Sequence, residues 1–124
     1  MKQEKNEGSN KNRDYVDYVE DILENTEKAI KFVEGMDYET FKNDDKTVFA
    51  TLRALEIVGE ATKKIPDSVR SDNPDVPWRE MAGIRDKLIH DYFGVNMEVI
   101  WKTVKQDLTV LKSQIEQIIE EHTD

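Results

Sequence analysis

The chain has 124 residues, a length that suits a single domain with a modest core. Its composition is 37% hydrophobic and 36% charged, and its net charge of −9 argues against a general nucleic-acid-binding protein. The absence of cysteine excludes a disulfide framework and a thiolate metal site, and two histidines are too few for a His-rich metal site.

The N-terminal stretch MKQEKNEGSNKNRD is polar and lacks the apolar segment of a secretion signal. No apolar run approaches the ~20 residues that a membrane span needs, so we expect a cytoplasmic protein with no membrane segment. We interpret residues 1–13 as a flexible leader and residues 14–124 as one helical domain.

The first helix is predicted over residues 15–34, with Asp14 as its N-cap and Gly35 as its stop. Its apolar residues repeat at steps of three and four, which indicates one buried face. The members of this stripe are Tyr15, Val19, Ile22, Thr26, Ile30 and Val33.

A second helix is predicted from Asp44 or Asp45 to about Lys64. Its apolar residues cover more than one face, so we expect a central helix that packs on two sides. Three residues interrupt this apolar surface: Glu56, Gly59 and Glu60.

All three prolines lie in IPDSVRSDNPDVP, which must connect two helices because proline removes an amide donor. A third helix is predicted from Trp78 to Phe93, where Gly94 ends it. The fourth begins after Asn96, and its apolar residues alternate steps of four and three as far as Ile118. The sequence therefore predicts an all-α fold, an antiparallel four-helix bundle.

Arg85 falls inside the apolar arc of the third helix when residues are projected at ~100° each. An unpaired buried guanidinium is very costly, so three explanations remain open. Arg85 pairs with Glu56 or Glu60 of the neighbouring helix, or its side chain reaches solvent along apolar neighbours. Alternatively, the arc faces a cleft or a second subunit, where an arginine can grip a phosphate.

His90 lies about 140° from Arg85 around the same helix, in a row with Asp86. Histidine is the side chain best suited to carry protons near neutral pH, although a lone histidine is more often structural. Tyr92, in the last turn, has the pattern of a half-buried packing residue. A helix distorted near its end, or a symmetric pair of helices, would bring Arg85 and His90 together, which is one reason to expect a homodimer.

Arg85, His90 and Tyr92 form the pattern R-x4-H-x-Y, and with it the chain resembles the HepT-like toxins of the HEPN superfamily. The surrounding segments ALEIVGEA, VPWREMAGIRDKLIHDYFGVN and IWKTVKQDL agree, so the resemblance covers roughly residues 14–120. It implies a HEPN-like four-helix core, usually dimeric, in which the two motifs face a shared cleft.

The resemblance also implies metal-independent RNA cleavage, in which the ribose 2′-hydroxyl attacks the neighbouring phosphorus and leaves a cyclic phosphate and a 5′-hydroxyl. Arg85 would then hold the scissile phosphate. His90 would orient or deprotonate the attacking hydroxyl, or protonate the leaving oxygen. We expect Glu56, Glu60 and Asp86 as supporting residues, and neither a metal nor a cofactor.

The resemblance further implies a partner, an MntA-type nucleotidyltransferase antitoxin that transfers AMP to Tyr92. The chain would thus be the toxin of a type VII-like toxin–antitoxin pair. Bulk and phosphate charge on Tyr92 would fill and neutralise the RNA site. Asp91 adds a negative charge beside the motif, which counts against strong nuclease activity.

A second hypothesis is a non-catalytic helical binding module that docks a nucleotidyltransferase, with Arg85 as a structural ion-pair residue. The acidic composition favours it, because RNA must approach against net repulsion. A carboxylate metal site inside the bundle is a weaker idea, since that chemistry uses Glu-x-x-His pairs. Lys87 and Ile119 stand where those glutamates would be needed.

Overall fold

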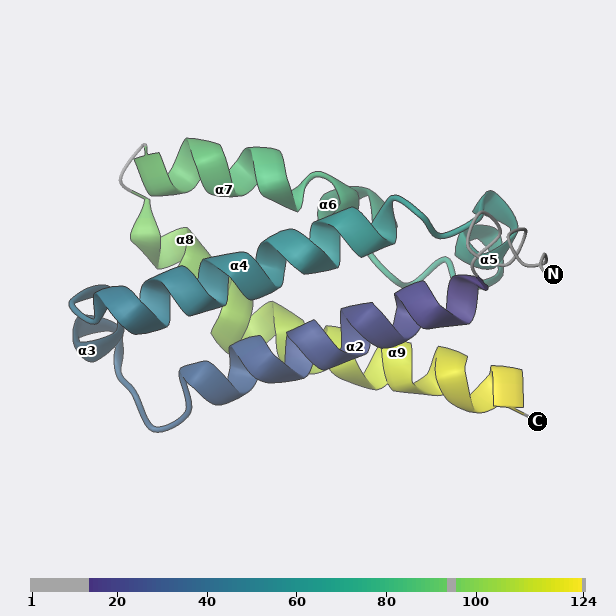
Figure 1. Cartoon of the computed structure of the whole chain (residues 1–124), viewed down its shortest axis with the longest axis horizontal. Coiled ribbons are helices and arrows are strands. Elements are labelled where there is room, and N and C mark those ends of the chain that lie inside the picture. Colours follow the sequence, from purple (N-terminus) through teal and green to yellow (C-terminus); the bar gives the residue numbers. More distant parts are fainter. Residues whose placement is uncertain (1–13, 94–95, 124) are drawn as a thin grey trace, which may run out of the picture.

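The computed structural model describes residues 14–93 and 96–123, apart from the side chains of residues 89–93 and 123. The leader expected at residues 1–13 therefore lies outside the described residues. All regular structure in the described part is helical, which confirms the predicted all-α fold (Figure 1). The elements are α2 (Tyr15–Phe32), α3 (Tyr38–Lys42), α4 (Asp45–Thr62), α5 (Asp67–Asp72), α6 (Trp78–Ala82), α7 (Ile84–Phe93), α8 (Met97–Lys102), η1 (Thr103–Asp107) and α9 (Leu108–Thr123).

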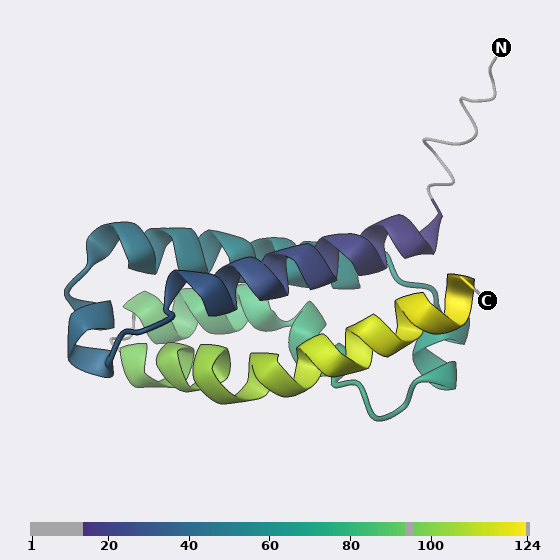
Figure 2. The same cartoon turned by 90° about the horizontal axis from the view of Figure 1, so that it is seen from below.

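The four predicted helices correspond to α2, α4, the pair α6–α7 and the run α8–η1–α9. Helix α2 packs against α4 and α9, α4 packs against α6 and α7, and α7 packs against α8. Figure 2 shows α8, η1 and α9 following one another along one long, bent rod beneath the other helices. The predicted central helix is thus α4, which contacts helices on both sides.

Aspartate side chains cap the N-terminal ends of α2, α3 and α4, whereas Asn96 makes no side-chain capping hydrogen bond at the start of α8. The side chain of Asp14 accepts a hydrogen bond from the Val16 N–H at 3.0 Å at the start of α2. After α2 the chain turns at Gly35, whose φ of 78° lies in the region that glycine favours. Asp37 then caps α3, and the hydrogen bonds that it accepts from Thr40 lower the pKa of its carboxyl group.

Two predicted helices are interrupted in the structure. The third was expected to be continuous over residues 78–93, but it breaks at Gly83 into α6 and α7. Glycine has a low helix propensity, and here its N–H bonds back to Arg79 and Met81 as a helix end. The fourth contains the π-helical segment η1, whose wider turns the regular three-and-four pattern did not predict. The predicted connection over residues 65–77 also contains a short helix, α5.

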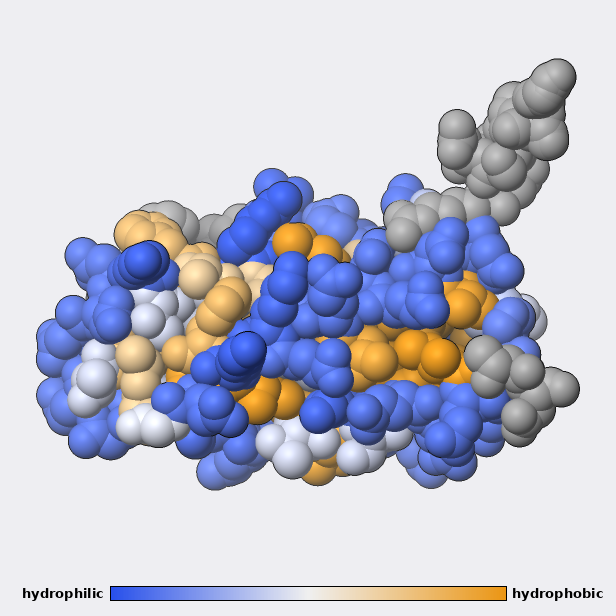
Figure 3. All heavy atoms as spheres, turned by 60° about the horizontal axis from the view of Figure 1, so that its bottom comes forward, coloured by the Kyte–Doolittle hydropathy of each residue, from blue (hydrophilic) through white to orange (hydrophobic). Residues whose placement is uncertain are grey.

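Apolar residues from all four long helices form one core, and most members of the predicted stripes are buried. Val19, Ile22 and Thr26 of α2 are fully buried, as are Leu55 and Val58 of α4. Phe49 is an exception, because it is 60% exposed although it belongs to the apolar set of the second helix. Figure 3 shows a face covered mostly by hydrophilic residues, with hydrophobic ones confined to narrow bands between them. In the part of the chain that is described, no helix is both long and apolar enough to cross a bilayer.

Gly59 marks the closest approach between α4 and the α6–α7 break. A Cβ atom on Gly59 would lie 2.6 Å from the Cγ2 of Ile84 and 3.2 Å from the carbonyl oxygen of Met81. It would also lie 3.8 Å from the backbone nitrogen of Arg85. The missing side chain at Gly59 therefore sets how near the start of α7 sits to α4.

We expect Gly59→Ala to lower the free energy of unfolding by up to about 2 kcal/mol, measured by urea denaturation. Overpacking costs ~1–3 kcal/mol, of which alanine recovers ~1 kcal/mol through its higher helix propensity. Gly83→Ala is the matched control, since a Cβ there would meet only its own turn, at 3.5 Å. Equal stability of the two variants would contradict the tight contact at Gly59.

Candidate functional site

Helix α7 carries four of the residues that the sequence singled out: Arg85, Asp86, His90 and Tyr92. Its backbone is a regular α-helix over the whole of Ile84–Phe93. The side chains of His90 and Tyr92 lie outside the described residues. Because α7 is regular, positions 85 and 90 remain about 140° apart around its axis.

Arg85 lies at the seam between α7 and α4, with its side chain 54% exposed. Its Nε is 3.8 Å from an oxygen of Glu56, and its Nη1 is 3.6 Å from an oxygen of Glu60. Two of the three explanations for Arg85 therefore apply at once: its guanidinium pairs with both Glu56 and Glu60, and its side chain also reaches solvent. Neighbouring Ile84 is buried, so the apolar arc of α7 ends at Arg85 and does not enclose it.

The pairing of Arg85 is loose by the standard of ion-pair geometry. Both N–O distances exceed the 2.7–2.9 Å that is usual for a charge-assisted hydrogen bond. Glu56 faces Nε and Glu60 faces Nη1, so the two acids approach different nitrogen atoms of the guanidinium. A phosphate could therefore bind Arg85 without first breaking a short hydrogen bond.

Asp86 does not join this cluster. It is exposed in the first turn of α7, and no ion pair is found for it within the described ranges 14–93 and 96–123. A carboxylate in the first turn interacts favourably with the helix dipole, which accounts for an acid at this position. The structure thus brings Glu56 and Glu60 to Arg85, but not Asp86.

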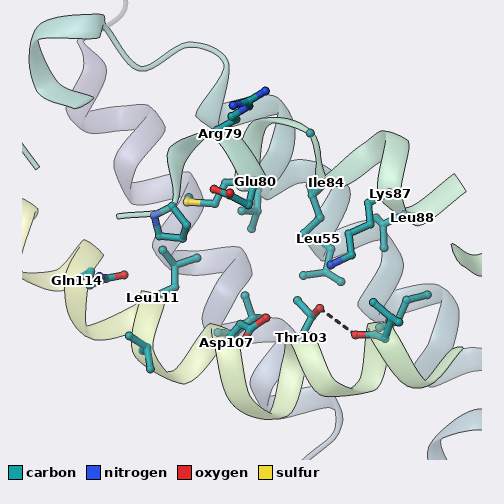
Figure 4. A pocket seen from close by; sticks show the side chains of 18 of the residues that line it. Leu55, Arg79, Glu80, Ile84, Lys87, Leu88, Thr103, Asp107, Leu111 and Gln114 are labelled. Carbon is teal, nitrogen blue, oxygen red and sulfur yellow. Dashed lines mark hydrogen bonds between the residues drawn. The ribbon is translucent and has the colours of Figure 1, made fainter. Parts of the chain in front are cut away.

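The other side of α7 borders a groove of about 710 Å³ (Figure 4). Helices α6 and α7 form one wall, α8, η1 and α9 form the other, and Leu55 and Val58 of α4 form the floor. Gly83 and Lys87 line this groove, whereas Arg85 does not. On α7, position 90 lies about 60° around the axis from Lys87, whereas position 85 lies about 160° from it, so position 90 belongs to the groove side. One chain therefore presents the two motif positions on different sides of the helix.

Sequence reasoning did not single out two cations near Arg85. Arg53 donates a hydrogen bond to Glu56 at 2.9 Å, and Lys63 lies 3.9 Å from Glu60. Both pairs have i, i+3 spacing on α4, which is the signal that could have found them. As for metals, the described portion of the chain contains no group of three or more potential histidine, cysteine or carboxylate ligands.

Comparison with known proteins gives a consistent family. The model of the family described as "Ribonuclease HepT-like" matches residues 22–118. A protein of Thermococcus cleftensis named as a probable ribonuclease HepT is 51% identical over 106 residues, which cover 86% of this chain and 96% of that protein.

Two further relatives carry names of the same kind. A presumptive RNase of Methanocaldococcus jannaschii is 43% identical, over 88% of this chain and 90% of its own length. Another, from Caldanaerobacter subterraneus subsp. tengcongensis, is 44% identical over 83% of this chain and 92% of its own length. No solved structure matches the chain significantly.

The exposure of the Arg85 pairs predicts that they contribute little to stability. Each of the single variants Glu56→Gln and Glu60→Gln should lower the free energy of unfolding by no more than about 1–2 kcal/mol, because each acid makes two solvent-exposed ion pairs worth ~0–1 kcal/mol each. Leu55→Ala is the comparison, since loss of a fully buried leucine costs ~2–5 kcal/mol. Urea denaturation of these variants tests this, and losses of equal size would mean that the Arg85 charge is buried.

Proposed function

Because this chain belongs to the HepT-like ribonuclease family, we propose that it is an endoribonuclease that cleaves RNA without a metal ion. The observation that supports this most directly is the setting of Arg85. Its guanidinium is half exposed and loosely held, so an RNA phosphate can reach it. A guanidinium sealed in the core, with its charge fully matched, could not bind a substrate.

In the proposed reaction the ribose 2′-oxygen attacks the adjacent phosphorus, and the bond from phosphorus to the 5′-oxygen breaks. The proton of the 2′-hydroxyl passes to a base, and the departing 5′-oxygen takes up a proton. The products are a 2′,3′-cyclic phosphate and a 5′-hydroxyl. Negative charge grows on the phosphate oxygens in the transition state, where the forked donors of Arg85 stabilise it. His90 carries one of the two protons.

We propose that two copies of the chain complete the site as a homodimer. Positions 85 and 90 point to different sides of one regular α7, so one helix does not direct both at the same phosphate. Two α7 helices related by a two-fold axis can present Arg85 of one copy and His90 of the other to a shared cleft. The exposed surface at Gly83 leaves room for such an approach.

Purified protein should cleave single-stranded RNA in the presence of EDTA and leave cyclic phosphate ends. Arg85→Ala should lower the rate about 100-fold or more, because removal of a donor to the developing charge typically costs that much. The cleavage rate of Arg85→Lys should lie between those of the unaltered protein and Arg85→Ala, since lysine keeps the charge but loses the forked geometry. Product analysis by gel and by mass spectrometry measures both the rates and the ends.

Lys28→Ala serves as the control for these rates, because Lys28 makes an exposed pair with Glu24 on α2, away from α7. Its rate should match that of the unaltered protein. His90→Ala should also lose activity. Full cleavage by either Arg85→Ala or His90→Ala would remove the proposed mechanism.

We also propose that this ribonuclease is the toxin of a type VII-like toxin–antitoxin pair in the cytoplasm. An MntA-type nucleotidyltransferase would act as its antitoxin. The phenol oxygen of Tyr92 would attack the α-phosphorus of ATP, form a phosphodiester to AMP and release pyrophosphate. Tyr92 lies seven residues after Arg85 on the same helix, so the added phosphate would place negative charge along the side of α7 that binds RNA.

A non-catalytic binding module remains the second candidate, and one observation favours it. The chain carries a net charge of −9, and Arg85 already has two carboxylate neighbours. The net charge and these carboxylates both repel the phosphates of RNA and so oppose its binding. In that case the protein would dock the nucleotidyltransferase and would not cut RNA. The EDTA-resistant cleavage assay separates this candidate from the first.

Incubation with an MntA-type nucleotidyltransferase, ATP and magnesium should raise the intact mass of the chain by one or more AMP units. Tyr92→Phe should abolish the gain, because it removes the attacking oxygen and little else. Tyr38→Phe is the matched control, since Tyr38 is half-buried on α3 and should leave the gain unchanged. A mass gain that persists in Tyr92→Phe would reject Tyr92 as the acceptor.

A further inference from the structure

Arg85 is the middle member of a row of alternating charges along the outer side of α4. Arg53 donates to Glu56 at 2.9 Å, and the second oxygen of Glu56 lies 3.8 Å from Arg85. Beyond Arg85, an oxygen of Glu60 lies 3.6 Å from its Nη1 and 3.9 Å from the amine of Lys63. We call these five residues the charged row. It holds three cations and two carboxylates, so it is net positive on a chain of net charge −9.

Helical geometry places the charged row on one face at a regular spacing. Three of its members lie on α4, and Lys63 is the C-cap residue of that helix with a helical backbone; these four fall within an arc of about 80° at ~100° per residue. Arg85 enters between Glu56 and Glu60, about halfway along the helix from Arg53 to Lys63. At 1.5 Å per residue the three cations are therefore about 7.5 Å apart along the axis of α4. That is roughly twice the ~3.4 Å rise per nucleotide of a stacked strand, so neighbouring cations would match phosphates two nucleotides apart in such a strand.

An exposed aromatic ring continues this face of α4. Phe49 stands one turn before Arg53, so the two share a side of the helix. Its side chain is 60% exposed, which is uncommon for phenylalanine in a folded domain. In Figure 1, α7 runs antiparallel to α4, so from Arg85 it leads toward Arg53 and Phe49. The motif positions that follow Arg85 thus lie toward the same end of the row.

We propose that the charged row and Phe49 form a track for single-stranded RNA along α4. The scissile phosphate lies at Arg85, the flanking phosphates lie at Arg53 and Lys63, and a base stacks on Phe49. Non-specific single-strand sites combine cations along the backbone with aromatic platforms for bases. Here three cations, separated by two carboxylates, are followed by the exposed ring of Phe49. The inference rests on the proposed role of Arg85 and adds the residues that bind RNA on either side of it.

The two carboxylates of the charged row have a role of their own. They hold the three cations apart and in line while RNA is absent, through pairs that are exposed to solvent. Exposed pairs of this kind are weak and easily exchanged, so phosphates can displace them. The carboxylates also repel RNA, which limits binding to strands that engage several cations at once. Glu60→Gln should therefore tighten RNA binding.

The test is the salt dependence of binding to a short single-stranded RNA that carries 2′-O-methyl groups. This probe keeps the phosphates and bases but cannot undergo 2′-hydroxyl attack. Arg53→Ala and Lys63→Ala should each reduce the slope of log affinity against log salt by about 0.7, the value for one phosphate contact on a single strand. Lys112→Ala is the charge-matched control, because Lys112 lies on α9 beside Glu27. Its slope should equal that of the unaltered protein.

Phe49→Leu tests the stacking contact separately. Leucine keeps most of the apolar bulk but removes the ring, so affinity should fall about five-fold or more with an unchanged salt slope. Phe32→Leu is the matched control, since Phe32 is a partly exposed phenylalanine on α2, and it should leave affinity unchanged. Equal effects of the two leucine variants would remove the stacking platform.

The outcomes separate this proposal from the proposed cleavage. If Arg53→Ala and Lys63→Ala behave like Lys112→Ala while unmodified RNA is cut, the track is wrong and the ribonuclease stands. If the slopes change as expected but no RNA is cut, the track stands and cleavage is wrong. If the two variants weaken binding of the nucleotidyltransferase but not of RNA, the charged row is a protein-docking surface and the track is overturned.

Discussion

The position of Arg85 depends on one close contact, the approach of the α6–α7 break to Gly59. No other residue type leaves space there, because a Cβ would meet the side chain of Ile84 and the backbone of Met81. The contact brings the start of α7 down onto α4 between Glu56 and Glu60, which stand three residues before and one residue after Gly59. Packing and electrostatics are therefore linked, since the residue that allows the helices to touch also sets which charges meet.

The same contact explains why a cation can stand within an apolar helix. Ile84 is buried against α4, whereas Arg85, the next residue, turns to the solvent edge of the seam. There it keeps much of its hydration, so it escapes the large cost of an unpaired buried charge. Its two ion pairs are weak for the same reason. Weak pairing suits a residue that must exchange carboxylates for a phosphate, as the proposed ribonuclease requires.

Helix α7 separates two surfaces of different character. Toward α4 it contributes Arg85 to the charged row, and toward α9 it borders a largely apolar groove. Because positions 85 and 90 fall on these different sides, the family motif does not converge within one regular helix. The proposed homodimer would allow Arg85 of one copy and His90 of the other to meet at one phosphate while α7 stays regular.

The sequence by itself determined the all-α class, the four long helices and most of their buried faces. Those features depend on local periodicity, on capping residues such as Asp14 and on chain-breaking prolines, all of which act within a few residues. It also indicated that Glu56, Gly59 and Glu60 interrupt an apolar surface, and that Arg85 needs a partner.

Only the tertiary structure decided the break at Gly83, the π-helical turn η1 and the exposure of Arg85 between two acids. A projection at ~100° per residue assumes an unbroken helix and contains no neighbouring helix. The environment of Arg85 is set by a contact with Gly59, 26 positions earlier in the chain, and no local pattern encodes the distance between those two helices.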